Sequence, residues 1–221
     1  MKCLVTAGPT YEPLDDVRRL TNFSTGRLGS ELADFLVAKG HTVTLLLGAQ
    51  ATYRGESRAQ EIEIFTTTAD LRDRLKARST QSPDAIFHAA AVSDFAFGKV
   101  LQRSSAGDLT EIKSGKISTR AGTLLAELVP TPKIIAELRD WHPRARIVGW
   151  KFEVDGTRAD AIALGERQLP ENRTDACVIN GPAYGTGFGF LTRPGHCSHS
   201  ADAPALFAAL ESFLHQPPAH S

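Results

Sequence analysis

The chain has 221 residues, enough for one α/β domain with a complete hydrophobic core. Lysine and arginine number 25, as do aspartate and glutamate, so the net charge is zero and no overall field attracts nucleic acid or an anionic membrane. There is no membrane-spanning run and no signal-peptide apolar region, and the 3 cysteines are widely spaced, so we expect a cytoplasmic protein with reduced thiols.

The first part of the chain alternates short apolar runs with amphipathic segments. We predict strands at residues 2–6, 41–47, 61–65 and 84–92, a helix of about four turns from Gly26 and a second helix at residues 68–78. Ser24 or Thr25 is expected to cap the first helix, and Gly40 to end it. This alternation predicts an α/β fold: a three-layer, Rossmann-like, doubly wound and mostly parallel sheet, with its ligand at the carboxyl ends of the strands.

Residues 95–129 break this pattern, because glycine, serine, threonine and basic residues dominate there. Only short pieces, such as residues 108–112, have the alternation of a strand. A segment of this length without regular structure inside a compact domain is usually functional or disordered. We therefore predict a lid or arm at residues 95–129, inserted in a single domain of residues 1–221.

Regular structure is predicted again after the arm. Thr131 is expected to cap a helix of about three turns with Pro132 in its first position. Strands at residues 145–152 and 174–180 flank a helix that begins with a capping box of Thr157 and Asp160 and ends at Pro170. A hairpin of residues 188–192 with the segment around Cys197 precedes a last helix capped by Asp202, and residues 215–221 should fray.

Two glycine-containing turns in the N-terminal part could form one anion site. The Gly8 turn follows the first strand, and the turn of Ser24 and Gly26 opens the first helix, so backbone N–H groups and a helix N-terminus can meet there. Between them lie Arg18, a fork-shaped cation suited to carboxylate or phosphate, and Asn22, an uncharged amide donor. The spacing matches neither a dinucleotide fingerprint nor a P-loop, and a glycine turn alone is as often purely structural.

Several motifs together carry a family resemblance. The residues TAGPT (6–10), PLDDVRRLTNFSTGRLG (13–29), AAAVSDF (89–95), GKIS (115–118), IVGWKFE (147–153) and ACVIN (176–180) follow one another in this order. This pattern resembles phosphopantothenate–cysteine ligase, also called phosphopantothenoylcysteine synthetase, over nearly the whole chain. Nothing resembles the flavin-dependent decarboxylase domain fused to this ligase in many bacteria, so we expect a stand-alone ligase that needs no flavin.

The resemblance implies a two-step reaction of coenzyme A biosynthesis. The carboxylate of 4′-phosphopantothenate attacks the α-phosphate of ATP or CTP, with release of pyrophosphate, and the amine of L-cysteine then attacks the acyl nucleotidylate. The family implies that Asn22 contacts the carboxylate and the acyl intermediate, and that Arg18 positions the acid substrate. Mg²⁺ would bridge phosphates without a dedicated protein cage, and the enzyme would be a homodimer that uses residues 95–129 or the hairpin after residue 188 as an arm.

The resemblance also implies a nucleotide site. Its expected residues are Gly8, Thr10, Ser24, Gly26, Ala90, Ala91, Asp94, Lys116 and Trp150. Lys116, on the arm, would neutralise the triphosphate as a catalytic residue beside Asn22 and Arg18, although most lysines in polar stretches are simply solvated. Trp150 is as readily a core residue as a contact to base or ribose, and His88 fits a hydrogen-bonded core histidine better than a base.

The chain departs from the bacterial members of this family in one helix. Where those members carry lysines, this chain has Gln168 and Asn172, with Arg167 and Arg173 nearby, which leaves open both the choice of ATP or CTP and full activity. One alternative is therefore a non-catalytic nucleotide-binding relative. A second, a short-chain NAD(P)-dependent oxidoreductase, needs a Tyr-x-x-x-Lys pair, which none of the chain's 3 tyrosines provides.

Overall fold

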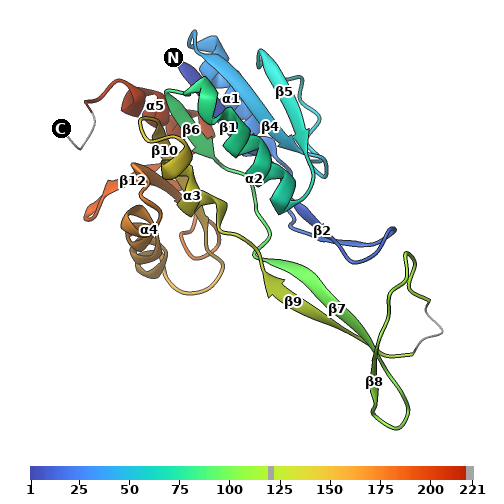
Figure 1. Ribbon diagram of the computed structural model, residues 1–221. Coiled ribbons are helices and arrows are strands. Elements are labelled where there is room, and N and C mark those ends of the chain that lie inside the picture. Colours follow the sequence, from blue (N-terminus) through green and yellow to red (C-terminus); the bar gives the residue numbers. More distant parts are fainter. Residues whose placement is uncertain (119–121, 218–221) are drawn as a thin grey trace.

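A central sheet of eight strands organises the computed structural model, which describes residues 1–118 and 122–217 (Figure 1). Its strand order is β13-β12-β11-β10-β6-β1-β4-β5. The parallel strands are β1 (Lys2–Ala7), β4 (Thr42–Gly48), β5 (Glu61–Phe65), β6 (Ala85–His88), β10 (Arg146–Phe152) and β11 (Ala176–Asn180); β12 (Phe188–Arg193) and β13 (His196–Ser200) are antiparallel. Renumbered along the chain, the parallel strands have the order 3-2-1-4-5-6, which is the Rossmann arrangement.

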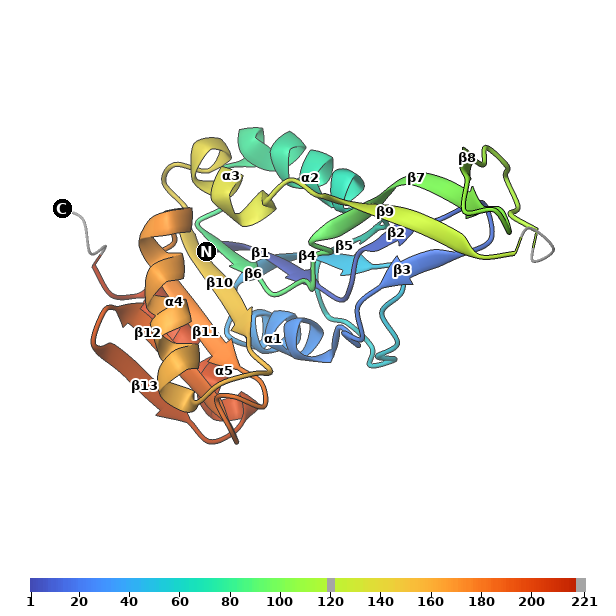
Figure 2. The same ribbon diagram turned by 90° about the horizontal axis from the view of Figure 1, so that it is seen from below.

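Helices cover both faces of this sheet, and Figure 2 shows them above and below it. On one face lie α1 (Arg27–Ala38) and α5 (Ala203–Leu214), and on the other α2 (Thr68–Ala77), α3 (Ile134–Trp141) and α4 (Arg158–Asn172); a short 3₁₀ turn, η1 (Arg78–Gln81), follows α2. The three-layer α/β prediction is confirmed. No helix within the described residues is both long and apolar enough to cross a membrane.

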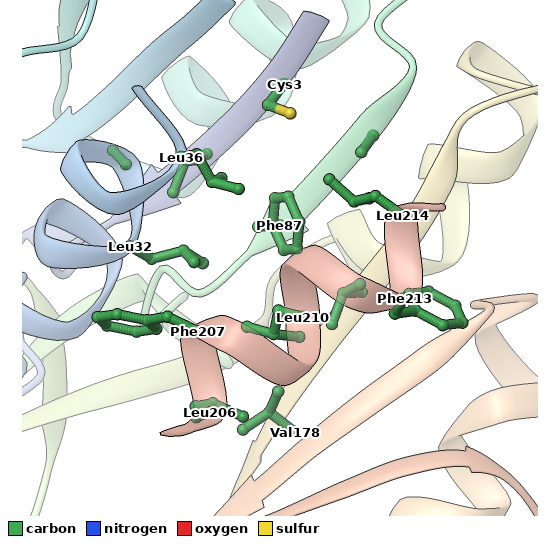
Figure 3. Packing of buried hydrophobic residues seen from close by; sticks show 14 of the residues in the cluster. Cys3, Leu32, Leu36, Phe87, Val178, Leu206, Phe207, Leu210, Phe213 and Leu214 are labelled. Carbon is green, nitrogen blue, oxygen red and sulfur yellow. The ribbon is translucent and has the colours of Figure 1, made fainter. Parts of the chain in front are cut away.

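The larger hydrophobic core lies under α1 and α5. Leu210 of α5 is fully buried and packs in one cluster with Leu36 of α1, Phe87 of β6 and Val178 of β11 (Figure 3). Burying one such side chain contributes about 1.5–3 kcal/mol. The C-terminal helix α5 therefore packs against residues of β1 and β6, which lie far from it in the sequence.

A second, smaller sheet forms the predicted arm insertion. It contains β7 (Phe95–Arg103), β8 (Leu109–Glu111) and β9 (Leu124–Pro130) in the antiparallel order β8-β7-β9 and extends away from the central sheet (Figure 1). The prediction found β8 but missed the longer β7 and β9. Both strands expose residues on each face, and their register is irregular between Phe97 and Val100, so they lack the alternation that marks a strand half-buried in a core.

Several predicted element ends are wrong, each for a local reason. Gly26 itself, in the left-handed region at φ 79°, precedes α1 and has no side chain to cap it, whereas the Thr25 hydroxyl accepts from the N–H of Arg27 at 3.3 Å. Lys133 precedes α3, because the Thr131 hydroxyl instead donates to the carbonyl of Ser93 at 2.5 Å, and α3 spans only 8 residues. Helix α4 continues through Pro170 to Asn172.

Other local predictions are confirmed. Thr157 and Asp160 form the expected capping box of α4, and the Asp202 carboxylate accepts from the N–H of Ala205 at the start of α5. Strand β6 ends at His88, four residues before its predicted end, because the following small residues leave the sheet to form a loop. Of the tail expected to fray, residues 218–221 lie outside the described part of the chain.

Candidate functional site

The loops after β1 and β6 meet at the point where the strand order of the sheet reverses. The chain leaves β1 toward β4 on one side and β6 toward β10 on the other, and ligands of doubly wound sheets bind in the crevice at this position. The N–H of Ala91 donates to the carbonyl of Gly8 at 3.0 Å, and the N–H of Thr10 donates to the carbonyl of Ala91 at 3.1 Å. Two segments far apart in the sequence are thereby held as one wall.

The two predicted glycine turns pack directly against each other. Gly8 and Gly26 have φ values of 81° and 79°, where L side chains are strained. A Cβ on Gly26 would lie 3.3 Å from the Cα of Gly8, and a Cβ on either glycine would lie 3.0 Å from the Cβ of Ala51. Helix α1 begins here with no acidic residue in its first turn, so no carboxylate of that turn offsets the positive end of the helix dipole.

A third loop, after β4, closes the other side of the turn that contains Ser24. The carbonyl of Thr25 accepts from the N–H groups of Thr52 and Tyr53 at 3.1 and 3.0 Å. The exposed Arg54 donates to the carbonyl of Ala51 at 3.0 Å, which adds a cation beside the glycine turns. Ser24 is half-buried in this arrangement.

Asn22 lies at the edge of the same wall. Its side-chain nitrogen donates to the carbonyl of Ala91 at 3.1 Å, and since a carbonyl only accepts, this contact fixes the orientation of the amide. The amide oxygen faces away from that bond, and the residue as a whole is exposed. The structure thus brings together Asn22, Ala91 and the two glycine turns. The sequence predicted that the two turns lie at one edge of the sheet, and it did not predict the contact between Asn22 and Ala91.

Thr10 does not line an accessible surface, contrary to the expectation that it faces phosphate. It is 0% exposed, and its hydroxyl accepts from the N–H of Ser93 at 2.8 Å and contacts the hydroxyl of Thr68 at 3.2 Å. It therefore positions the loop after β6 from inside. Thr6, in strand β1, also positions this loop, because its hydroxyl accepts from the N–H of Ala90 at 3.1 Å.

His88 is the core histidine that the sequence indicated. Its Nδ1 lies 3.0 Å from the hydroxyl of Thr6, and the residue is buried. Burial lowers the pKa of the imidazole to about 4, so the ring is neutral at neutral pH.

Arg18 and Lys116 lie together, in a second group of site residues. The Arg18 guanidinium pairs with Asp15 and donates to the carbonyl of Ile117 at 2.8 Å, and the Asp15 carboxylate accepts from the N–H of Ile117 at 3.1 Å. The N–H of Asp16 donates to the carbonyl of Gly115 at 2.9 Å. These bonds clamp the segment that contains Lys116 against the turn between β2 (Tyr11–Pro13) and β3 (Arg19–Thr21).

The two cations of this second group differ in whether a carboxylate pairs with them. Asp15 neutralises Arg18, and the hydrogen bonds from the Arg18 guanidinium are the main reason why the pKa of Asp15 lies well below its usual range. Lys116 is exposed, and no carboxylate of the described residues pairs with its ammonium. Lys116 is therefore the cation that remains free to meet an anion.

The two groups do not meet within one chain. Arg18 precedes β3 at the tip of the hairpin, whereas Asn22 follows β3 at its base. At about 3.3 Å per strand residue, the intervening segment separates them by about 13 Å. The sequence did not predict that Arg18 and Asn22 lie at opposite ends of a hairpin, because it gives the order of the motifs and not the distance between them.

Two further predicted nucleotide contacts lie beside the first group. Trp150 follows Gly149, which pairs with His88, so it stands level with the loop of Ala89 to Ala91. It is half-buried, and its indole Nε1 is buried with no partner among the described residues. Asp94 is exposed where the chain enters the arm.

Gln168 and Asn172, where the chain departs from the bacterial members, do not face an open surface. Both side chains are buried beneath α4, where the Gln168 amide donates to the sulfur of Cys177 at 3.3 Å and the Asn172 amide donates to the carbonyl of Gln168 at 3.2 Å. Arg173 pairs with Asp140 at 2.7 Å. In the structure these residues pack the helix on the sheet, and the choice of ATP or CTP stays open.

The sequence analysis missed residues that act through others. Thr6 and Asp15 hold the loop after β6 and the Lys116 segment, and Arg54 lies beside the glycine turns. Asp15 was within reach of prediction, because an aspartate three residues before an arginine in a turn pairs readily with it. Thr6 gave no signal, since its partner Ala90 is distant in sequence. Arg54 gave none either, because its contact with the carbonyl of Ala51 follows no recognisable motif.

Comparison with known proteins gives one family. Residues 1–199 match the model of the DNA/pantothenate metabolism flavoprotein C-terminal domain. A cysteine/cysteine sulfinic acid decarboxylase of an unknown prokaryotic organism is 32% identical over 193 residues, which cover 86% of this chain and 49% of that protein. The coenzyme A biosynthesis bifunctional protein CoaBC of Thermococcus kodakarensis is 31% identical over 180 residues, which cover 81% of this chain and 41% of that protein. The chain thus spans less than half the length of these relatives.

Solved structures agree with this fold. The DNA/pantothenate metabolism flavoprotein from Streptococcus pneumoniae superimposes with a TM-score of 0.83 at 26% identity and covers 97% of this chain and 98% of that one. A Cab2 mutant H337A in complex with phosphopantothenate-cysteine superimposes with a TM-score of 0.70 at 20% identity over 96% of this chain and 87% of that one, a likeness of fold alone.

Proposed function

The chain belongs to the family of the DNA/pantothenate metabolism flavoprotein C-terminal domain, and from this premise we propose that it is a phosphopantothenate–cysteine ligase. In the proposed reaction the carboxylate of 4′-phosphopantothenate attacks the α-phosphate of a nucleoside triphosphate and pyrophosphate leaves. The amine of L-cysteine then attacks the acyl carbon, and the nucleoside monophosphate leaves. A carboxylate becomes a good acyl donor only once its oxygen belongs to such a phosphate leaving group.

The observation that carries the proposal is the wall built on the carbonyl of Ala91. The Asn22 amide donates to this carbonyl, and the Gly8 loop is bonded to the same residue beside the free N-terminus of α1. Phosphoryl transfer needs positioned N–H donors and cations more than it needs an acid or a base. A neutral His88 in the core agrees with this, since it offers no base to the surface.

Each residue of the first group would then have one task. The N–H groups around Gly8, Ser24 and Gly26 would hold phosphate oxygens at the start of α1, with Arg54 as an additional cation. Asn22 would use the second N–H of its amide nitrogen to hold the reacting carboxylate and the acyl intermediate without adding charge.

The nucleotide would lie along the loop after β6. Ala90 and Ala91 have no side chain beyond Cβ, which permits close approach, and the unpartnered indole N–H of Trp150 would find an acceptor on base or ribose. Mg²⁺ would be carried by the triphosphate, whose charge it would offset, with Asp94 as the exposed carboxylate at hand.

Lys116 would act from the arm. Its free ammonium would neutralise charge that develops on the triphosphate, while Arg18 would act through Asp15 and Ile117 by holding the Lys116 segment. Arg18 is then a positioning residue for catalysis, and any contact with the acid substrate would require its exchange from Asp15.

A direct assay tests the proposal. Purified protein is incubated with 4′-phosphopantothenate, L-cysteine, Mg²⁺ and either ATP or CTP, while pyrophosphate and the thiol product are followed. Turnover that requires cysteine supports the ligase, and the ratio of rates with ATP and CTP gives the nucleotide. Nucleotide binding without product would identify a non-catalytic relative, and the ligase proposal would then be abandoned.

We further propose that the active form is a homodimer joined through the arm. Leu109, Leu128 and Val129 of the arm are exposed by 51%, 52% and 41%, more exposed apolar side chains than a solvated arm would need. Leu128→Glu should shift the protein to monomers in analytical ultracentrifugation at micromolar concentration. Ile64→Glu, which changes an equally exposed residue of β5 on the central sheet, is the matched control and should leave the dimer intact.

A further inference from the structure

A cluster of two histidines and a glutamate lies where the last helix meets the start of β4. Glu211 and His215 are four residues apart on one side of α5 and its end, and His41 precedes β4. Within the described residues, these side chains form the one group of three potential metal ligands whose ligand atoms all lie within 4.8 Å of one another. His41 Nε2 is 3.7 Å, and His215 Nε2 2.8 Å, from Oε1 of Glu211.

His41 is not explained by the fold alone. It is 5% exposed, yet neither of its ring nitrogens has a hydrogen-bond partner among the described residues. Leaving a buried polar group unpaired costs about 1–3 kcal/mol, so such groups in native proteins usually have a partner, an ordered water or an ion. The cluster offers the missing partner as a bound cation.

We propose that His41, Glu211 and His215 form a zinc site that fastens the C-terminal helix to the corner between α1 and β4. Two imidazoles and one carboxylate are a donor set that Zn²⁺ accepts, with water in the fourth position. In a tetrahedral site with bonds of about 2.0–2.1 Å, ligand atoms lie about 3.4 Å apart. The present separations of 2.8 Å and 3.7 Å bracket this value, so metal binding would widen the first and shorten the second by small side-chain movements.

The cluster contains one carboxylate that can offset part of the charge of a bound metal. Glu211 lies within 4 Å of both imidazoles, with its Oε1 at 3.7 Å from His41 Nε2 and 2.8 Å from His215 Nε2. Lys39 on the end of α1 and the amino group of Met1 also face the cluster and oppose a cation, so binding depends on direct coordination by the three side chains.

This site is separate from the proposed ligase site. His41 lies at the amino end of β4, whereas Gly48 at the other end of that strand contacts Gly8. Seven residues at about 3.3 Å each put about 23 Å between them. The role that follows is structural: the zinc would join the N-terminal strands to α5, the helix that covers the larger core.

Zinc titration of the untagged full chain tests the proposal. Protein freed of metal with EDTA is titrated with ZnCl₂ in a phosphate-free buffer without nucleotide, by calorimetry and by thermal unfolding. We expect about one equivalent to bind and, at a hundredfold excess over Kd, the melting temperature to rise by about 5–10 °C. Co²⁺ should give the visible absorption of a four-coordinate site.

Two variants and a control assign the binding to this cluster. His215→Ala and Glu211→Gln alter partly exposed groups, so both should fold and both should weaken zinc binding at least tenfold. His196→Ala removes an exposed histidine of β13 outside the cluster and should bind as the parent does. Absence of zinc binding below millimolar concentration, or binding that His196→Ala removes and His215→Ala retains, would overturn the proposal. Because no nucleotide is present, failure of the ligase assay would leave this result unaffected.

Discussion

Replacement of Thr10 by valine tests whether this buried residue builds the site from within. Valine keeps the shape of threonine but has a methyl group where the hydroxyl accepts from the N–H of Ser93 at 2.8 Å and contacts the hydroxyl of Thr68. The Ser93 N–H would then be a buried donor with no acceptor. We expect Thr10→Val to loosen the loop after β6 without touching any exposed residue.

The magnitude follows from these contacts. A buried donor left unpaired costs about 1–3 kcal/mol. In a chain of about this length, 1 kcal/mol corresponds to about 2–4 °C in melting temperature. Taking about 2 kcal/mol for the lost acceptor, Thr10→Val should melt about 4–8 °C below the parent, and its ligase rate should fall because the Ser93 to Asp94 loop is no longer held.

Thr10→Ser is the matched control, because it keeps the hydroxyl and loses one methyl group. That loss costs about 1 kcal/mol. Calorimetric melting of the three proteins at pH 7, with the coupled pyrophosphate assay alongside, makes the comparison. If the valine variant is as stable as the serine variant, the Ser93 bond has no energetic role and the argument for Thr10 as a positioning residue is refuted.

Three further predictions concern the groups around this loop. Asn22→Ala should lower formation of product at least tenfold while nucleotide still binds, as measured by turnover and by equilibrium titration with the nucleotide; near-normal turnover would remove Asn22 from the mechanism. Lys116→Ala should reduce the rate with a melting temperature within about 2 °C of the parent, because the side chain is exposed, whereas Lys113→Ala, which changes a neighbouring lysine that pairs with Glu111, should have the parent's rate. His88 should make the fold acid-sensitive: its folded pKa of about 4 lies below the unfolded value of 6.5, so the unfolded chain takes up the proton first and stability falls as the pH falls from 6.5 to 4. At about 1.4 kcal/mol per pKa unit, urea unfolding of the parent should lose up to about 3 kcal/mol more over this window than unfolding of His88→Asn, and equal losses would show that His88 does not titrate in this way.

The sheet and the first group of site residues could be predicted because each rests on local pattern. Alternating apolar runs and helices predict parallel strands in a doubly wound sheet, and the observed strand order brings the ends of β1 and β6 together although they are distant in the sequence. The Gly8 turn, Gly26 and Asn22 were therefore expected at one edge. Their contacts through Ala91 and Ala51 were beyond prediction, since these alanines carry no chemical signal.

The second group was predicted only as residues, without their arrangement. Arg18 and Lys116 were assigned by resemblance, but the sequence does not say that Asp15 occupies the guanidinium of Arg18 or that the hairpin carries it away from Asn22. The burial of Gln168 was missed for a similar reason. The inner face of helix α4 carries polar residues, among them Gln168, whose amide donates to the sulfur of Cys177. Polar residues at helical spacing normally predict a solvent-exposed face, so the sequence did not indicate that this side chain is buried.

The hairpin β2–β3 connects the group of Asn22 to the group of Arg18 and Lys116. A two-stranded hairpin alone is marginally stable in water, so its position depends on what holds it. At its base the Thr21 hydroxyl donates to the carbonyl of Thr10 at 2.8 Å, and Glu12 accepts from the N–H of Thr68 at the start of α2 at 2.9 Å. At its tip Asp15 binds the N–H of Ile117 in the arm. The same short strands therefore join the contacts near Asn22 at the base to the contacts that hold the Lys116 segment at the tip.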